Sequence, residues 1–185
     1  MTMLNDPVRR CTTRLHSVCQ TLELDPEMEI EYGSGTVEFT APGENRPLHT
    51  TCTVRHSGVV LVTPLQLPVT PEHRITQLGR LIDEMNYHVS EGFIEKRPEV
   101  CGIRYRLSLP CPAKLIRTAM LRSLVVLNLC STRMVKTMLT AFVQSDLSTE
   151  EVLEIASRDG AWSDIVPEDY DTEQMWESYR QELEV

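Results

Sequence analysis

The sequence predicts an α+β fold in which an antiparallel sheet carries helices on one side, followed by an acidic helical extension. Strand-like stretches joined by short turns occur in two runs, one between residues 28 and 62 and one between residues 89 and 109. Amphipathic helical segments precede, separate and follow these runs, which gives the order α-β-β-β-α-β-β-α. Acidic residues then accumulate, so the chain divides into an α+β domain (1–143) and an extension (144–185).

The first helix is expected to open at Asp6-Pro7 and to end before Pro26. Aspartate suits the N-cap, and proline suits the first helical position. Apolar residues recur behind this start at helical spacing, at Val8, Cys11, Leu15, Val18, Cys19 and Leu22.

The first run contains three or four strands. Alternating or β-branched residues mark 28–32, 37–40, 50–55 and 59–62. The stretch 33–35 is too short to be a phosphate-binding loop, so it is interpreted as a turn, and a second turn is expected at Ser57-Gly58.

A second helix is expected to begin at Thr70-Pro71, where the cap-and-proline pattern repeats, and to end near Asn86. Strands 89–96 and 100–109 then form a hairpin. The second of these strands alternates best in the whole chain, with its apolar face formed by Cys101, Ile103, Tyr105, Leu107 and Leu109. Its polar face is formed by Gly102, Arg104, Arg106 and Ser108.

The longest helix is expected over 114–144. One apolar stripe consists of Ile116, Met120, Leu124, Leu127, Met134, Met138 and Phe142. Five further residues widen it, namely Leu121, Val125, Leu129, Val135 and Leu139. An arc this wide must be covered on more than one side, either by the sheet and a second helix or by a subunit interface.

The extension differs in charge from the rest of the chain. It holds 13 of the 27 acidic residues and only two arginines, a net charge of −11, whereas residues 1–143 carry +2. Ser148 and Glu151 form a capping box that predicts a short helix. Asp171 can cap a last helix, whose narrow apolar stripe is Met175, Trp176, Tyr179 and Leu183.

Composition argues against several classes of protein. A net charge of −9 disfavours general binding to nucleic acid or anionic lipid, and few aromatic residues are available for an RNA-binding sheet. The sequence contains no run of about 18 apolar residues and no apolar signal region near its start. We therefore expect a cytoplasmic protein that binds neither nucleic acid nor membrane.

The six cysteines show no spacing typical of a zinc site, and we interpret them as small buried apolar side chains. No sequence motif of a hydrolase, a nucleotide-binding loop or a dinucleotide-binding fold is present. A Cys–His pair between His88 and Cys101 is disfavoured because Cys101 falls on the apolar strand face. We expect no catalytic residues, no metal, no cofactor and no small-molecule substrate; a small enzyme with an unrecognised site is the alternative.

The stretch 78–110 resembles the core of the YbjN-like sensory-transduction regulators. The matching residues are Leu81, Asn86, Phe93, Arg104, Arg106, Leu107 and Pro110. The order of elements over about residues 5–143 is also similar to the type III secretion chaperone fold, which that family shares. The resemblance implies a bacterial homodimer that binds another protein and has no chemistry of its own. The partner is then a signalling protein such as a sensor kinase, or an exported substrate if the chain is a secretion-type chaperone.

Two groups of residues are candidates for partner binding. Arg104 and Arg106 share a strand face, with Arg97 nearby, and they can accept acidic partner groups. The alternatives are a solvated face, pairing with acids of this chain, or binding of its own acidic extension. The second group is Met175, Trp176, Tyr179 and Leu183, which can anchor in a partner groove or dock on this chain's own domain, including by exchange between subunits.

Overall fold

The computed structural model describes residues 6–42, 47–89, 92–97 and 102–158. Its first element is α1 (Pro7–Thr21), which begins where the sequence predicts. The carboxylate of Asp6 accepts a hydrogen bond from the backbone N–H of Val8 at 3.0 Å, so the predicted N-cap is confirmed. The predicted apolar face is buried except for Leu22, which lies past the end of the helix and is only partly buried.

The strands form one six-stranded sheet in which every neighbouring pair is antiparallel. They are β1 (Asp25–Glu31), β2 (Ser34–Ala41), β3 (Leu48–Arg55), β4 (Gly58–Leu65), β5 (Phe93–Arg97) and β6 (Gly102–Leu109). Their spatial order is β1-β2-β3-β4-β6-β5. The first run therefore contains four strands, one more than the order α-β-β-β-α-β-β-α allows, because residues 28–62 divide into two complete hairpins.

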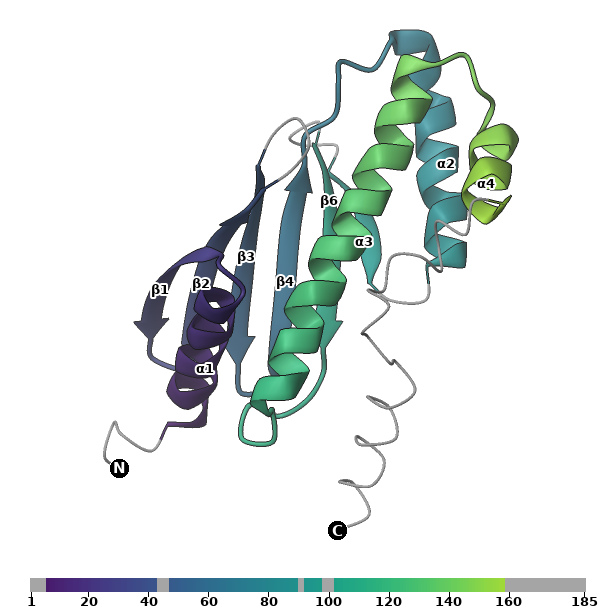
Figure 1. Ribbon diagram of the computed structural model, residues 1–185. Coiled ribbons are helices and arrows are strands. Elements are labelled where there is room, and N and C mark those ends of the chain that lie inside the picture. Colours follow the sequence, from purple (N-terminus) through teal and green to yellow (C-terminus); the bar gives the residue numbers. More distant parts are fainter. Residues whose placement is uncertain (1–5, 43–46, 90–91, 98–101, 159–185) are drawn as a thin grey trace.

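Two helices cover the same face of this sheet, which confirms the predicted α+β class (Figure 1). Helix α1 packs on β1 and β2, and α3 (Thr118–Gln144) crosses β4 and β6. The core between the two layers includes the alternate strand residues Val37, Cys52, Leu61 and Tyr105, all fully buried. The apolar half of each strand thus points at the helices, as period-two alternation requires.

The two hairpin turns lie one residue earlier than predicted. Glu31 pairs with Ser34, so Tyr32 and Gly33 alone form the first turn, and Gly33 takes the positive φ of 74° that this turn demands. Gly35 is the second residue of β2 and serves a different purpose. A Cβ atom there would collide with the side chain of Thr12, so glycine allows α1 to approach the sheet closely.

The second helix starts later than predicted. A 3₁₀ turn, η2 (Glu72–Arg74), precedes α2 (Ile75–His88), and Thr70 is not its N-cap. The short turn directs the side chain of Arg74 into the protein, where only 5% of the residue is exposed. The expected end of α2 near Asn86 is correct to within two residues.

The long helix α3 begins at Thr118, four residues after the predicted start. The preceding segment is a loop that binds the sheet, because the N–H of Ala113 donates to the carbonyl of His56 at 3.1 Å. The predicted apolar stripe of α3 is confirmed in part, since Leu124, Met138 and Phe142 are buried. The innermost stripe consists of residues that were predicted to widen it. Leu121, Val125, Val135 and Leu139 are fully buried, whereas three predicted stripe residues, Met120, Leu127 and Met134, are only partly buried.

A buried polar cluster lies under the middle of α3. Thr63 on β4 donates to the amide oxygen of Asn128 at 3.0 Å, and the hydroxyls of Thr63 and Thr50 are 2.8 Å apart. All three residues are at least 99% buried. Because such groups are costly to bury without partners, this cluster favours one register of α3 over the sheet.

The last described helix, α4 (Thr149–Arg158), packs against α2 and α3. Its predicted capping box is confirmed. Ser148 Oγ accepts from the N–H of Glu151 at 3.2 Å, and the Glu151 carboxylate accepts from the N–H of Ser148 at 2.7 Å. These hydrogen bonds hold the pKa of Glu151 below its ordinary value.

Arg74 ties the end of α3 to the start of α2. Its guanidinium donates to the carbonyls of Ser145 and Leu147, and its Cζ lies 4.0 Å from the centre of the Phe142 ring. A cation at a helix C-terminus is favourable, and the arginine fork satisfies carbonyls that the helix leaves free. This contact sets the position of α2 relative to α3.

Replacing Arg74 should therefore weaken the fold. We expect Arg74→Ala to lower the free energy of unfolding by about 2–4 kcal/mol, because two charge-assisted hydrogen bonds and the ring contact are lost together. Urea denaturation followed by circular dichroism measures this. Arg80→Ala, on the exposed face of α2, is the control, and equal stability of the two variants would contradict the assignment.

Candidate functional site

The sheet face opposite α1 and α3 is the broadest surface that the fold leaves uncovered by the described helices (Figure 1). We call it the open face. Strand register aligns its residues in rows across all six strands, one of which is Glu27, Glu38, Thr51, Val62, Arg106 and Phe93. The row begins with acids and ends with a base and an exposed aromatic ring, so charge changes sign from one edge of the sheet to the other.

Acidic side chains form the β1 side of the open face. Asp25, Glu27, Glu29 and Glu31 alternate along β1, and Glu38 stands beside Glu27 on β2. Asp25, Glu27 and Glu38 border an open depression of about 250 Å³ whose other polar lining includes Thr40, His49 and Thr51.

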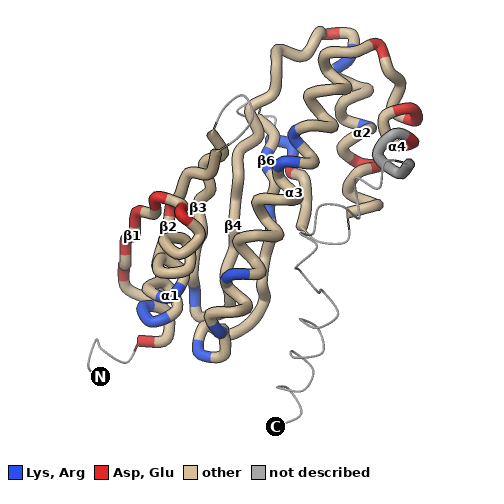
Figure 2. Tube along the Cα trace, in the orientation of Figure 1, with Lys and Arg blue, Asp and Glu red and all other residues tan. Residues whose placement is uncertain are grey.

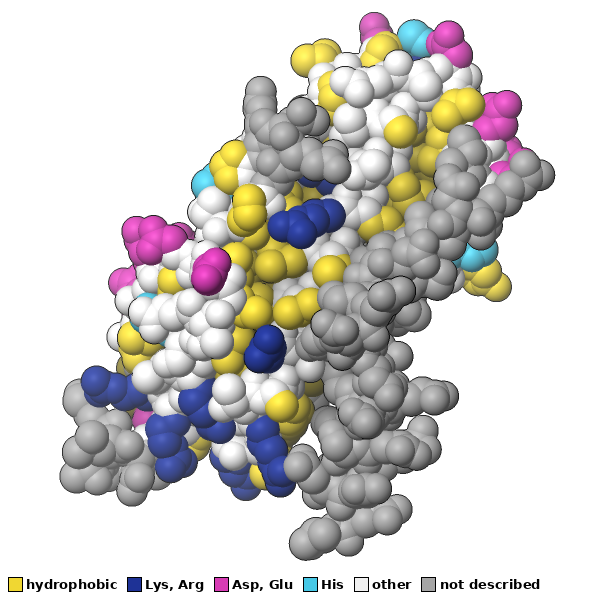
Figure 3. Space-filling model, in the orientation of Figure 1, with side chains coloured by type: hydrophobic (Ala, Val, Ile, Leu, Met, Phe, Trp, Pro, Cys, Tyr) yellow, Lys and Arg dark blue, Asp and Glu magenta, His cyan; other side chains and the backbone are white. Residues whose placement is uncertain are grey.

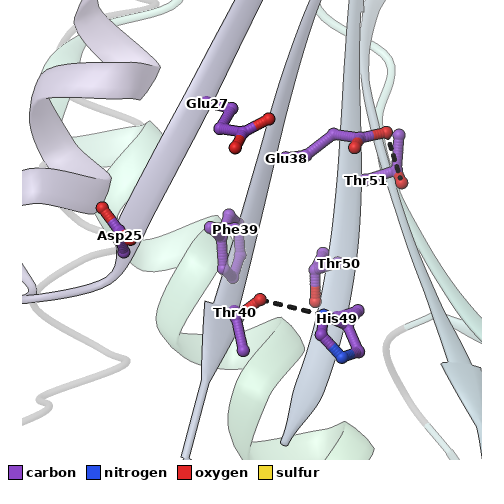
Figure 4. A pocket seen from close by; sticks show the side chains of 8 residues that line it. All are labelled: Asp25, Glu27, Glu38, Phe39, Thr40, His49, Thr50 and Thr51. Carbon is purple, nitrogen blue, oxygen red and sulfur yellow. Dashed lines mark hydrogen bonds between the residues drawn. The ribbon is translucent and has the colours of Figure 1, made fainter.

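Hydrogen bonds between neighbouring strands orient some of the side chains that line this depression. Figure 4 shows Thr51 donating to Glu38 at 3.3 Å and the Thr40 hydroxyl 2.9 Å from Nδ1 of His49. The described residues include no group of three acidic, histidine or cysteine side chains placed to hold a metal ion. The depression is smaller and more open than the pockets that bury small ligands.

Two rows cross the middle strands of the open face without a charged residue there. Thr36, Thr53, Val60 and Ser108 form one row, and Thr51 and Val62 belong to the next. The threonines and valines are half-buried in the single chain. Covering such a strip costs little desolvation compared with covering the charged flanks.

Arginines occupy the other side of the open face. Glu95 on β5 faces Arg104 across the strand pair, binds its Nε atom and accepts from Arg106 Nη1 at 3.1 Å. Burial opposes ionisation of Glu95, but the hydrogen bonds and charges of the two arginines outweigh it and lower the pKa of this carboxyl. One carboxylate therefore serves two guanidinium groups, and the cluster retains positive charge.

The structure thus brings together the first group of predicted site residues. Arg104 and Arg106 point to the same face as the alternation predicts, and both bind an acid of their own chain. Arg97 ends the adjacent strand β5 and pairs in register with Gly102. The second predicted group, Met175, Trp176, Tyr179 and Leu183, lies outside the described residues, as does Cys101.

The β5 edge of the sheet is closed by α2. The Asn86 side chain accepts from the N–H of Ile94 at 2.7 Å and donates to its carbonyl at 2.9 Å, which imitates a neighbouring strand. Lys96 reaches Asp83 on the same helix at 2.6 Å. These contacts disfavour the addition of another strand at the β5 edge.

The described cysteines are poor nucleophiles. Cys11, Cys19 and Cys52 are buried as predicted, while Cys111 and Cys130 are partly exposed. Burial raises the pKa of all five thiols, that of Cys19 to about 12. These thiols are therefore protonated at neutral pH.

Comparison with known proteins adds no relative to this description. No protein-family model matches the chain, and neither the curated proteins nor the solved structures include a match. None of the helices in the described ranges has the length and apolar character needed to cross a membrane.

Sequence reasoning missed the acidic half of the open face. The alternation of Asp25, Glu27, Glu29 and Glu31 was visible along the chain and indicated one polar strand face. Its relation to Arg104 and Arg106 was not visible, because strand order and register, which no local pattern specifies, bring Glu38 and Arg106 into one row.

The Glu95 cluster predicts a pH dependence of stability. Because the folded pKa lies below the ordinary value of 4.5, ionised Glu95 stabilises the fold above that pH, and this stabilisation is lost as the pH falls through the folded pKa. We expect Glu95→Gln to cost about 1 kcal/mol at neutral pH and nothing at an acid pH below the folded pKa, where the wild-type carboxyl is protonated as well. Urea titrations at both pH values measure this. The control is Glu27→Gln, which removes a carboxylate that neighbours Glu38 and binds no arginine in the described residues. A constant loss at both pH values would contradict the ion-pair explanation.

The thiols predict a labelling order. Among the described cysteines, iodoacetamide should modify Cys111 first in the folded protein, while Cys11, Cys19 and Cys52 should react only at urea concentrations that unfold the chain. Mass spectrometry of labelled peptides measures the order. Rapid labelling of Cys19 in the folded state at neutral pH would show that its thiol is accessible to solvent, which contradicts its burial.

Proposed function

We propose that this chain is a non-enzymatic protein-binding module of the cytoplasm that acts as a homodimer. The observation that carries the proposal is the open face, a six-stranded surface with carboxylates at one side, arginines at the other and an uncharged strip between them. Such a surface fits another polypeptide better than a small molecule, because it is broad and its described depression is open.

The size of the open face suits a stable interface. Six strands spaced about 4.8 Å apart, with five to eight residues that rise about 3.3 Å each, give roughly 700 Å². Two such faces in contact bury about 1,400 Å² in total, which falls within the usual range for specific complexes.

The charge pattern favours a second copy as the occupant of this face. Consider two open faces that meet about a two-fold axis parallel to the strands, with the axis between β3 and β4. Strand β2 of one copy then lies over strand β6 of the other. Glu38 of each copy then faces Arg106 of the partner, because both belong to one row. An axis perpendicular to the strands sets acids over acids and is disfavoured.

The resemblance to YbjN-like regulators supports a role in bacterial signalling, and the resemblance to secretion chaperones supports binding of an exported substrate. What supports both roles is the sheet that carries helices on one side, although its first run has a fourth strand beyond the expected order of elements. The two roles differ in the protein that co-purifies with the chain, a signalling protein such as a sensor kinase in one case and an exported substrate in the other.

A charge-exchange experiment tests the dimer. We expect Glu38→Arg and Arg106→Glu each to weaken self-association more than about tenfold, because each variant sets like charges opposite one another. Mixing the two variants should restore a dimer, since both contacts across the mixed interface then pair an acid with a base. Analytical ultracentrifugation measures all three samples.

Glu150→Arg on α4, which makes the same charge change away from the open face, is the matched control and should leave association unchanged. A wild-type chain that stays monomeric would overturn the homodimer, and so would a dimer that is insensitive to both single variants. Turnover of a metabolite by the purified chain would overturn the non-enzymatic proposal.

A further inference from the structure

A second charged surface lies at one end of the molecule, where α1 and α3 begin. Figure 2 shows Lys and Arg positions gathered there, and Figure 3 shows their dark blue side chains on the surface. We call this surface the basic end. It consists of Arg9, Arg10, Arg55, Lys114, Arg117 and Arg122.

Three segments that are distant in sequence meet at this end. Asp6 before α1 lies 4.0 Å from Nε2 of His56 in the β3–β4 turn, and His56 also accepts from Ala113 in the loop before α3. These contacts bring the basic residues of each segment into one region. Two acidic residues adjoin it, Asp6, which caps α1, and Glu31, which precedes the β1–β2 turn.

The charge of the basic end is largely uncompensated. Within the described residues, no ion pair involves Arg9, Arg10, Arg55, Lys114 or Arg122, although all five are exposed. Helix α3 has neither an acidic cap nor an acidic residue in its first turn, so the positive end of its dipole adds to the field, whereas Asp6 caps α1.

Exposed apolar groups accompany this charge. Tyr32 in the β1–β2 turn and Leu115 in the loop before α3 are among the exposed large hydrophobic residues. The surface therefore suits a segment that combines several carboxylates with a few apolar side chains.

Residues 159–185 of this chain have that composition. They hold nine acidic residues and one base, Arg180, a net charge of −8, together with the predicted apolar stripe Met175, Trp176, Tyr179 and Leu183. Their length also suffices. Helix α3 spans about 40 Å between its two ends, and 27 residues span about 40 Å as a helix and up to about 90 Å when extended.

We propose that the basic end is the docking site of residues 159–185 of the same chain, held by carboxylate–arginine contacts with the apolar stripe beside Tyr32 and Leu115. Apart from Arg55, which shares a row of the open face with Glu31 and Ser34, this site lies off the open face. Arg104 and Arg106 are weaker competitors for the segment, because Glu95 already binds both guanidinium groups. A docked segment neutralises the basic end and keeps other polyanions from binding there.

The tryptophans provide a specific reporter, because both of them, Trp162 and Trp176, lie in this segment. Acrylamide quenching of their fluorescence in the full-length protein measures how well the segment is protected. At low ionic strength we expect Arg10→Gln/Lys114→Gln to raise the quenching constant about twofold. In the wild type, 1 M salt should do the same, since charges are then screened within about 3 Å.

The matched control is Arg80→Gln/Arg133→Gln, which removes two exposed charges from α2 and α3 away from both surfaces and should leave quenching unchanged. Arg104→Gln/Arg106→Gln tests the rival site, and release by this variant instead of the first would move the docking site to the open face and overturn the proposal. Quenching that ignores both salt and Arg10→Gln/Lys114→Gln would also overturn it. Protection that is lost on dilution would assign the docked segment to a second copy, and would exclude docking within one chain.

Discussion

The burial of one sheet face beneath α1 and α3 is the constraint from which the other features of this structure follow. Leucine, valine and cysteine side chains on alternate strand positions meet Leu121, Val125 and Leu139 of α3, and removing this apolar surface from water stabilises the fold. Because side chains alternate along a strand, the same register that buries one set exposes the other. The composition of the open face is therefore decided when the core forms.

The position of α3 depends on contacts at both of its ends and in its middle. The loop before it binds the β3–β4 turn through Ala113, and Asn128 meets Thr63 in the core. Arg74 binds the carbonyls that follow its C-terminal end. Together these contacts carry α3 across the sheet and beyond it to α2 and α4, and they leave the basic end at one extremity and α4 at the other.

Local patterns predicted the elements of the fold better than their edges. The cap at Asp6 and the capping box at Ser148 are short-range hydrogen-bond motifs, so neighbouring residues were enough to locate them. The start of α3 was predicted four residues early because Ala113 donates a hydrogen bond to His56 in the β3–β4 turn. This contact joins residues that are distant in sequence, so no local pattern indicates it. The buried stripe of α3 was partly misjudged for a related reason, since Met120 and Leu127 are as apolar as the residues that the core selects.

The sequence by itself determined the α+β class, the polar strand face with Arg104 and Arg106, and the charge difference between residues 1–143 and 144–185, because each depends on composition or on spacing along the chain. Only the tertiary structure decided that Glu95 binds both arginines and that Glu38 shares a row with Arg106. It also gathered six bases from α1, β3 and the start of α3 at one end. Strand order and helix packing bring these residues together. The residues are far apart in the sequence, so no local pattern indicates that they lie near one another.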